Sequence, residues 1–291
     1  MKIIDTTTYF EEDLMMDLRF NILDPYVDKF IICESTFTHS GNKKDISFDK
    51  KKYSRFKDKI IHLILENEPD NLIKKDHLNT VEKRQNSILR IKEQRNFIAN
   101  ALTEFSENDL VIHSDNDEIP NLENIDFRTI NKRFIIFNQK LFYYKLDLTV
   151  PEINWFGSKA CKLKYFKDVD NLRNIKNKKY SFFRFDTYFS NIKKISVEII
   201  NNGGWHFSNL KSAKQLEKKY LNDENHAEYE LKDTSYETIK DNILRKVVPY
   251  NYEVDKSSNQ RFNETKLDNI DLNYLPKYIN NNIEKYKEWF S

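Results

Sequence analysis

The stretch that decides the fold is Leu110-Val111-Ile112-His113-Ser114-Asp115-Asn116-Asp117-Glu118-Ile119-Pro120. It opens with a short apolar run of the kind that forms a buried β-strand, and three carboxylates follow almost at once. In a largely parallel sheet such residues lie beyond the carboxyl end of a strand, where α/β proteins bind their ligands. The stretch therefore predicts an α/β protein with a binding site just after Ile112.

Apolar runs alternate with helical periodicity on the N-terminal side of this stretch. Strands are predicted at residues 2–4, 27–33, 60–65 and 110–112, and helices at 11–23 and 80–105. This alternation indicates a mixed, mostly parallel sheet flanked by helices. Glu34 follows the second strand, so we expect it at the same edge of the sheet as Asp115.

The second half of the chain has a weaker pattern. Residues 133–137 and 141–146 are predicted to pair as strands, 195–200 to form a strand, and 211–220 a helix. A C-terminal helix is predicted at 276–290, with Pro276 at its favoured first position. Residues 182–189 are rich in aromatic side chains, and 255–263 are polar and predict a loop. No repeat and no linker divides the chain, so we expect a single domain.

The composition narrows the class of protein. The 291 residues carry 48 basic and 46 acidic side chains, a net charge of +2, which does not indicate a nucleic-acid partner. Local basic clusters are interpreted as solvated surface, with an anionic membrane or a glycan as the alternative partner. These clusters are Lys43-Lys44, Lys50-Lys51-Lys52, and Lys176 with Lys178-Lys179.

Cysteine content and hydropathy bear on location. Cys33 and Cys161 are the two cysteines, too few for a disulfide framework, which favours a reducing compartment. The residues after Met1 lack the apolar segment of a signal peptide, and no apolar run reaches the roughly 20 residues that span a bilayer. We expect a cytoplasmic protein without a transmembrane segment, with peripheral contact at the inner membrane surface as an option.

The acidic cluster suits a hard divalent cation. Two carboxylates one residue apart can share Mn²⁺ or Mg²⁺ with a diphosphate. The Asp-x-Asp triplet is weak evidence alone, because it recurs at Asp168-Val169-Asp170, where no buried strand precedes it. The alternative for Asp115 is a turn residue that accepts backbone N–H bonds. Glu118 adds a third carboxylate, which a turn does not need and a metal site could use.

The segment Gly203-Gly204-Trp205-His206 is the second informative place, since the chain has only 4 glycines. Adjacent glycines let a ligand approach the main chain. Trp205 offers a flat face for a sugar ring, and His206 can bind a metal or a phosphate. The alternative is a tight turn followed by core side chains. His226 with Glu228 is a weaker pair, for which an exposed charged loop is the alternative.

Taken together, these residues resemble glycosyltransferase family 17, the family of the β-1,4-N-acetylglucosaminyltransferases that add the bisecting residue to N-glycans. The resemblance is strongest in Glu93-Gln94-Arg95-Asn96 followed by Asp109 to Pro120. The other matching positions, in order, are Asp5, Glu12, Asp17, Arg19, Val27 to Ser35, Phe37-Thr38, Gly41, Lys43, Tyr143-Tyr144, Trp155, Gly157, Gly203 to Ser208, His226, Glu228-Tyr229 and Leu275 to Tyr278.

The resemblance implies a GT-A-type fold in one domain, with residues 1–120 as the nucleotide-sugar-binding half and 121–291 as the acceptor-side half with the C-terminal helix. It also implies a metal-dependent, inverting transfer of a sugar, from UDP-N-acetylglucosamine, onto a glycan acceptor in surface polysaccharide or glycoprotein glycan synthesis. The implied metal residues for Mn²⁺ or Mg²⁺ are Asp115, Asp117 and His206. The donor-binding residues expected on this basis are Asp5, Glu34, Arg95, Asp115, Trp205 and His206. An inverting transfer also needs a carboxylate base near the acceptor hydroxyl, and Glu118 or Glu228 is predicted for that role.

Two other functional classes use a similar scaffold. A sugar-phosphate nucleotidyltransferase needs a glycine-rich loop near the N-terminus, and no glycine precedes Gly41, which disfavours that class. A non-catalytic glycan- or nucleotide-binding protein on the same scaffold stays open, although the intact acids at Asp115, Asp117 and Glu118 favour an enzyme.

Overall fold

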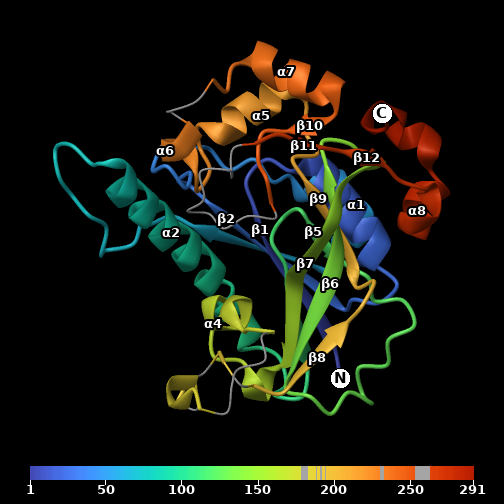
Figure 1. Ribbon diagram of the computed structural model, residues 1–291. Coiled ribbons are helices and arrows are strands. Elements are labelled where there is room, and N and C mark those ends of the chain that lie inside the picture. The colour runs from blue at the N-terminus through green and yellow to red at the C-terminus, as the bar shows by residue number, and fades with distance from the viewer. Residues whose placement is uncertain (178–182, 188, 191, 194, 230–232, 253–262) are drawn as a thin grey trace.

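The computed structural model describes residues 1–177, 183–187, 189–190, 192–193, 195–229, 233–252 and 263–291. Its centre is a mixed sheet with the strand order β3-β2-β1-β4-β7-β6-β9-β5. Helices α2 and α4 lie on one side of this sheet and α1 and α8 on the other (Figure 1). The predicted α/β class, with a mixed sheet flanked by helices, is confirmed.

The N-terminal half follows the sequence pattern closely. The parallel strands are β1 (Ile3–Tyr9), β2 (Lys29–Ser35), β3 (Ile60–Leu65) and β4 (Leu110–His113). The helices are α1 (Asp13–Leu23), η1 (Lys50–Phe56), α2 (Thr80–Phe97) and α3 (Ala99–Leu102). The long helix predicted at 80–105 is thus interrupted after Phe97. The carboxyl ends of β1, β2 and β4 meet at one edge of the sheet.

The C-terminal half departs from the prediction. Residues 133–137 and 141–146 do not pair with each other, because they belong to one strand, β6 (Phe134–Tyr143). Its antiparallel partner is β7 (Leu148–Lys162), which no predicted strand covered. Register shifts interrupt the pairing of β6 with β7, and this irregularity obscures the alternation of apolar residues on which the prediction relied.

The remaining strands are β5 (Glu118–Pro120), β8 (Val197–Ile200), β9 (Gly204–Ser208), β10 (Val247–Val248), β11 (Thr265–Lys266) and β12 (Asp268–Asn269). The remaining helices are η2 (Leu163–Tyr165), α4 (Val169–Asn174), η3 (Phe185–Thr187), α5 (Ala213–Tyr220), α6 (His226–Tyr229), α7 (Tyr236–Arg245), η5 (Leu272–Tyr274), α8 (Lys277–Asn280) and η6 (Ile283–Trp289).

The predicted C-terminal helix is two short pieces, α8 and η6. Pro276 precedes α8 as its N-cap instead of occupying the first helical turn. The break falls in the run Asn280-Asn281-Asn282, and asparagine favours turns over helix interiors. Lys178, Lys179, Phe182 and residues 255–262 of the polar loop predicted at 255–263 lie outside the described residues. No helix in the described ranges is long and apolar enough to cross a bilayer.

Two apolar cores fill the two faces of the sheet. One packs α1 and α8 against the sheet through residues such as Leu18, Phe20 and Ile279, and the other packs α3 and α4 through residues such as Ile98 and Leu172. Cys33 and Cys161 lie in the second core as free thiols. Burial raises the pKa of each thiol to about 12.

A buried ion pair joins α1 to the sheet. The Arg19 guanidinium, which is fully buried, donates from Nε and Nη2 to the two carboxylate oxygens of Asp5 on β1, both at 2.6 Å. Its Nη1 donates to the main-chain oxygen of Glu118 on β5 at 2.6 Å. Because an unpaired buried charge is costly, this bond network fixes β1, β5 and α1 relative to one another.

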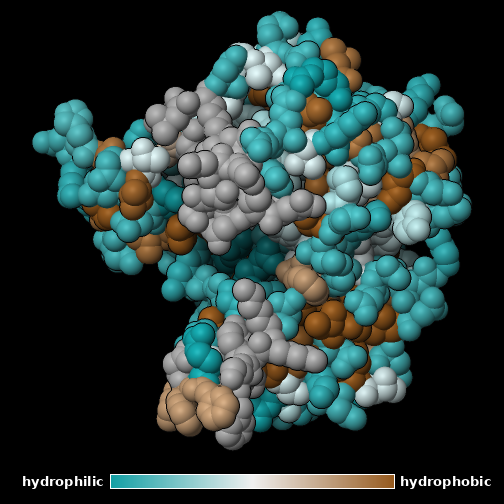
Figure 2. All heavy atoms as spheres, viewed as in Figure 1, coloured by the Kyte–Doolittle hydropathy of each residue, from teal (hydrophilic) through white to brown (hydrophobic). Residues whose placement is uncertain are grey.

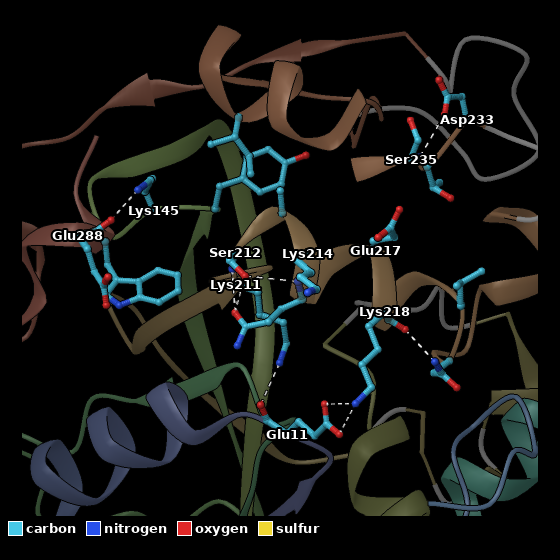
Figure 3. A pocket seen from close by; sticks show the side chains of 18 residues that line it. Glu11, Lys145, Lys211, Ser212, Lys214, Glu217, Lys218, Asp233, Ser235 and Glu288 are labelled. Carbon is cyan, nitrogen blue, oxygen red and sulfur yellow. Dashed lines mark hydrogen bonds and ion pairs between the residues drawn. The ribbon is translucent and has the colours of Figure 1, made fainter. Parts of the chain in front are cut away.

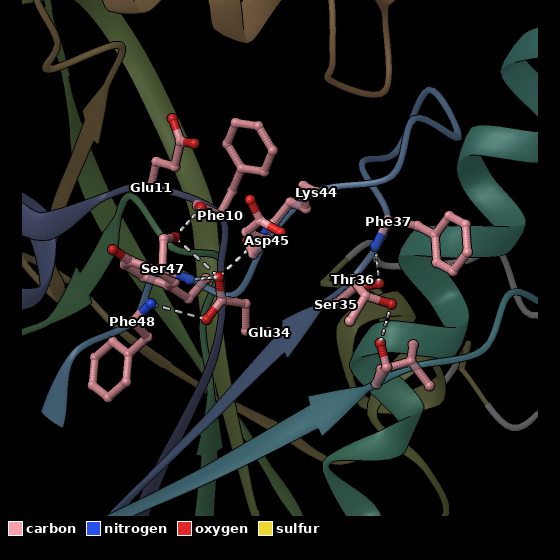
Figure 4. A network of polar contacts seen from close by, with 12 residues as sticks. Phe10, Glu11, Glu34, Ser35, Thr36, Phe37, Lys44, Asp45, Ser47 and Phe48 are labelled. Carbon is pink, nitrogen blue, oxygen red and sulfur yellow. Dashed lines mark hydrogen bonds and ion pairs between the residues drawn. The ribbon is translucent and has the colours of Figure 1, made fainter.

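A second buried carboxylate, Glu34, holds the loop after β2 (Figure 4). Its oxygens accept hydrogen bonds from the Lys44 Nζ at 2.6 Å, the Ser47 backbone N–H at 2.8 Å and the Phe48 backbone N–H at 3.1 Å. The Nε2 atom of His62 lies 3.3 Å away. Burial favours the protonated acid, but His62, Lys44 and the two N–H groups outweigh it and lower the pKa of Glu34 to about 2.

Replacing Arg19 by methionine leaves Asp5 buried without a counter-charge. We expect the free energy of unfolding, measured by urea denaturation, to fall by about 3–5 kcal/mol. The matched control is Lys52→Met, which breaks an exposed pair with Asp13 and should change stability little. Equal losses in the two variants would contradict the role assigned to Arg19.

The Glu34 carboxylate should make stability depend on pH. Its folded-state pKa is lowered, so its contribution is complete above the ordinary pKa of a glutamic acid and is lost as the pH falls through about 2. Glu34→Gln should therefore lose about 2 kcal/mol at pH 7, since hydrogen bonds to a charged group are worth roughly 1.5–3 kcal/mol. Urea unfolding of both proteins between pH 7 and pH 3 should show the difference narrowing at low pH; a constant difference would contradict this account.

Candidate functional site

The predicted acidic cluster lies where the sequence placed it, at the carboxyl end of β4 and the start of β5. In Figure 2 the surface is hollowed between α2 and the strands, and the visible floor of the hollow is hydrophilic. Residues from four elements gather around the cluster: Arg95 from α2, Arg173 from α4, Trp155 from β7 and His206 from β9.

Asp115 is held by two arginines. One carboxylate oxygen accepts from the Arg95 Nη2 at 2.5 Å, and the other accepts from the Arg173 Nη2 at 2.6 Å. Burial favours the protonated form, but the charges of Arg173 and Arg95 overcome it and hold the pKa of Asp115 well below its usual range. The carboxylate is therefore ionised at neutral pH, and it holds the guanidinium groups of Arg95 and Arg173 in the site.

Glu118 is fully buried and supports the same arrangement. Its Oε1 accepts from the Trp155 indole N–H at 2.7 Å and from the Arg173 Nη2 at 2.9 Å. Its Oε2 accepts from the Asp115 backbone N–H at 3.1 Å. Both oxygens are thus occupied, and the side chain orients Arg173 and the start of the acidic turn.

Asp117 and His206 face each other across the β5–β9 pair. The Nε2 atom of His206 lies 3.2 Å from the Oδ2 atom of Asp117, and the indole of Trp155 packs on the imidazole with ring centres 4.3 Å apart. Burial lowers the pKa of His206, but Asp117 outweighs burial and raises it. Burial raises the pKa of Asp117, and the charge of His206 outweighs this and lowers it.

The fit of this pair to a divalent cation can be judged from its atoms. A carboxylate beside an imidazole is a ligand pair that Mn²⁺ accepts readily, whereas Mg²⁺ prefers oxygen alone. Asp115 does not join the pair here, since both its oxygens bind arginines. Among the described residues, no three histidine, cysteine or acidic side chains converge as a ligand set. Asp117 and His206 would supply two ligands to a cation, and its remaining ligands would have to come from a bound group such as a diphosphate.

Trp205 and His206, predicted to act together, lie on opposite faces of the sheet. Neighbouring residues of a strand alternate in direction. His206 pairs with Glu118, whereas Trp205 pairs with Ile119 and donates its indole N–H to the Tyr274 carbonyl at 2.6 Å. The structure does not bring Trp205 to Asp117.

The other predicted residues have distinct positions. Glu34 lies near the carboxyl end of β2, as expected, whereas Asp5 lies inside β1, which continues to Tyr9. Each is buried and engaged by the partners described above. The main chain of Glu228 lies in α6, and its side chain is outside the described part of the chain. Asp168, of the second triplet, caps the N-terminus of α4 by accepting from the Asn171 N–H at 2.7 Å.

Arg173 is the main residue that sequence reasoning missed. It lies 58 positions from Asp115, in a short helix within an irregular segment, and no pattern marked it. Gly157, which is among the positions that match the family, helps to position Arg173. Its main-chain oxygen accepts a hydrogen bond from the Arg173 Nη1 at 2.7 Å. A Cβ there would lie 1.9 Å from the Gln139 Oε1 and 2.8 Å from the Glu118 Cδ, so only glycine fits.

A large cavity of about 1120 Å³ lies along α5 and α7. Figure 3 shows Lys211 and Lys218 reaching from the α5 side to Glu11, which follows β1, with Lys145 and Glu288 at the opposite end. Lys218 Nζ lies 2.6 Å from the Glu11 carboxylate. Helix α5 also carries Lys219, whose charge, together with that of His206, lowers the pKa of Asp117.

Curated proteins of known activity are similar to this chain. The β-1,4-mannosyl-glycoprotein 4-β-N-acetylglucosaminyltransferases of Homo sapiens and Rattus norvegicus are each 23% identical over 228 residues. Each alignment covers 71% of this chain and 40% of the relative, so the chain spans about two fifths of the length of these curated relatives.

Solved structures resemble the chain more distantly. HddC from Yersinia pseudotuberculosis is 13% identical with a TM-score of 0.31, covering 69% of this chain and 90% of HddC. A glycosyltransferase involved in the glycosylation of the major capsid of PBCV-1 is 10% identical with a TM-score of 0.27, covering 69% and 82%.

The family model settles the classification. It matches residues 1–288, a range that includes the strands of the central sheet, Arg95, the acidic cluster, Arg173 and the Gly203 to Ser208 segment. The chain belongs to glycosyltransferase family 17.

Proposed function

We propose that this protein transfers a sugar from a nucleotide-sugar donor to a glycan acceptor. The observation that carries the proposal is the pairing of acids with two arginines and a histidine at the carboxyl ends of β4 and β5, in a chain of this family. The curated relatives are named as N-acetylglucosaminyltransferases, so we propose UDP-N-acetylglucosamine as the donor.

The two arginines suit the leaving group. A guanidinium binds a phosphate through two parallel N–H groups, as it binds a carboxylate. Arg95 and Arg173 are held within 2.6 Å of Asp115, so they are already oriented before a diphosphate arrives. We propose that they stabilise the negative charge that develops on the departing nucleoside diphosphate, the kind of prearranged charge that lowers barriers most.

We propose Asp117 and His206 as the protein ligands of a divalent cation, with Mn²⁺ favoured over Mg²⁺ because of the imidazole. When bound, the cation would supply further positive charge to the diphosphate. Displacement at the anomeric carbon is proposed to proceed in one step with inversion. The acceptor hydroxyl then needs a base, for which Glu118 and Glu228 stay predictions; the buried, doubly occupied Glu118 suits an orienting role better.

The cavity beneath α5 and α7 is the proposed acceptor site. Its volume of about 1120 Å³ is slightly above the roughly 300–1,000 Å³ that is usual for ligand sites in proteins. Helix α5, which lines it, also carries Lys219, whose charge acts on Asp117. Its lining mixes lysines and acids with Trp289, whose flat face suits a sugar ring. The glycan would belong to a surface polysaccharide or a glycoprotein.

One prediction of the proposed function concerns Asp117. Purified protein should bind or slowly hydrolyse one nucleotide sugar of a panel, with Mn²⁺ and not with a chelator. Asp117→Ala should lower the rate by about 100-fold or more, as expected for removal of a group that acts on the developing charge. The matched control is Asp170→Ala in the second Asp-x-Asp triplet, which should retain activity.

Full turnover by Asp117→Ala would contradict the proposed metal site. A folded protein that binds no nucleotide and no nucleotide sugar, with or without metal, would contradict the transferase function. That result would leave the non-catalytic glycan-binding alternative.

Another prediction of the proposed function concerns Arg173. Arg173→Met should weaken binding of UDP, measured by calorimetry in the presence of chelator, by about 10-fold or more, since one charge-assisted contact is worth roughly 1.5–3 kcal/mol. Arg173→Lys should recover only part of the loss, because an ammonium lacks the planar pair of N–H groups. The control Lys92→Met removes an exposed lysine of α2 and should bind normally; unchanged binding by a folded Arg173→Met would contradict the assignment.

A further inference from the structure

A separate cavity of about 440 Å³ opens on the opposite face of the sheet from His206. The strand registers establish the two faces. Trp205 pairs with Lys140, and Lys140 pairs with Asn154, so these three side chains share one face. His206 and Glu118 pair on the other face. The thickness of the sheet therefore lies between this cavity and the acidic cluster.

Primary amides dominate the polar lining of this cavity. Those that line it are Asn121, Asn138, Asn154, Asn202 and Asn273. Gln139 also borders the cavity, but its side chain is on the opposite face, where its Nε2 donates to the Ser158 Oγ at 3.1 Å. The Asn138 Nδ2 donates to the Asn154 Oδ1 at 3.0 Å, which orients both amides. This bond uses one N–H of Asn138 and one oxygen of Asn154, and each amide has further donors or acceptors. A row of groups that both donate and accept suits a ligand rich in hydroxyls.

Aromatic rings supply the apolar part of the lining. The Trp205 indole is fixed by its bond to the Tyr274 carbonyl, and the Tyr274 ring is 58% exposed. The Lys140 Nζ lies 4.9 Å from the centre of that ring. The fixed Trp205 indole and the exposed Tyr274 ring give the cavity an apolar surface, and the oriented amides give it a hydrogen-bonding surface. These two surfaces match the two kinds of surface on a pyranose.

The charges of the lining argue against an anionic ligand. Lys277 is paired with Glu123, and Lys140 is the other lysine of the lining. The lining therefore has little net charge. A phosphate or a nucleotide needs a cluster of cations or a row of free backbone N–H groups, and this cavity is built from amides and rings instead.

We propose that this cavity binds a neutral oligosaccharide, at a site separate from the reaction site. The proposal goes beyond the transfer reaction and does not depend on it, because Trp205, Lys140 and Asn154 lie on the opposite face of the sheet from His206 and Glu118. It would let the protein hold one part of a glycan while the reaction site on the other face works on another part or another chain.

The test uses the full chain and a panel of neutral di- to tetrasaccharides ending in mannose, glucose, galactose or N-acetylglucosamine, with sialylated sugars for comparison. Isothermal titration calorimetry of the wild type should detect binding of at least one neutral member. Tyr274→Ala and Asn154→Ala should each weaken it by about 5- to 10-fold, the effect of losing one ring contact or hydrogen bond.

The matched control is Tyr236→Ala, an exposed tyrosine of α7 that also has a lysine beside its ring, and it should bind normally. Saturating UDP with Mn²⁺ should leave the affinity unchanged, because the two sites lie on different faces. Absence of binding by the wild type, stronger binding of the sialylated sugars, equal losses in Tyr236→Ala, or competition by UDP would each overturn the proposal. Donor hydrolysis is measured in parallel, so failure here is distinguishable from failure of the transferase function.

Discussion

The buried guanidinium of Arg19 is the constraint from which the site follows. A charge without solvent must find its acceptors inside the protein, and the chain supplies them from β1 and from the first residue of β5. The backbone of Glu118 is thereby tied to the middle of the sheet. Its side chain then faces Arg173 and Trp155, and its Oε2 accepts from the Asp115 N–H. One buried ion pair thus sets the direction of the whole acidic turn.

The site that results is close to electrically balanced. Asp115 and Glu118 meet Arg95 and Arg173, and Asp117 meets His206. This balance lets three carboxylates stay ionised close together in a half-buried site. Without the positive partners, their mutual repulsion would favour protonation of at least one of them. Under the proposed function, a diphosphate and a divalent cation would bring charges of opposite sign into this balanced site.

The N-terminal half was predictable because each of its elements has a local signature. Buried apolar runs marked β2, β3 and β4, and the acids after Ile112 were correctly placed at a strand end. The contacts of Arg173 were beyond prediction, since they join residues 55 and 58 positions apart and depend on the course of α4. Strands β6 and β7 were obscured for a related reason, because bulges disturb the period of two that marks a strand.

Trp205 and His206 show a different limit of prediction from the sequence. Adjacent residues of a strand point to opposite faces, so the assignment of β9 as a strand would have separated them. The glycines before them favoured a loop instead. Gly204 has a φ of 132°, and a Cβ there would lie 2.2 Å from the Ile119 carbonyl oxygen, so this glycine serves the close pairing of β5 with β9.

The two buried cysteines have a practical consequence for studying motion in this protein. A thiol reacts as its thiolate, and a pKa of about 12 leaves almost none at neutral pH. Maleimide dyes or spin labels should therefore ignore Cys33 and Cys161 in the folded state. Two introduced cysteines, one on the surface of α5 or α7 and one across the large cavity, would be labelled selectively. The distance between the two probes could then be followed spectroscopically without first removing the native thiols.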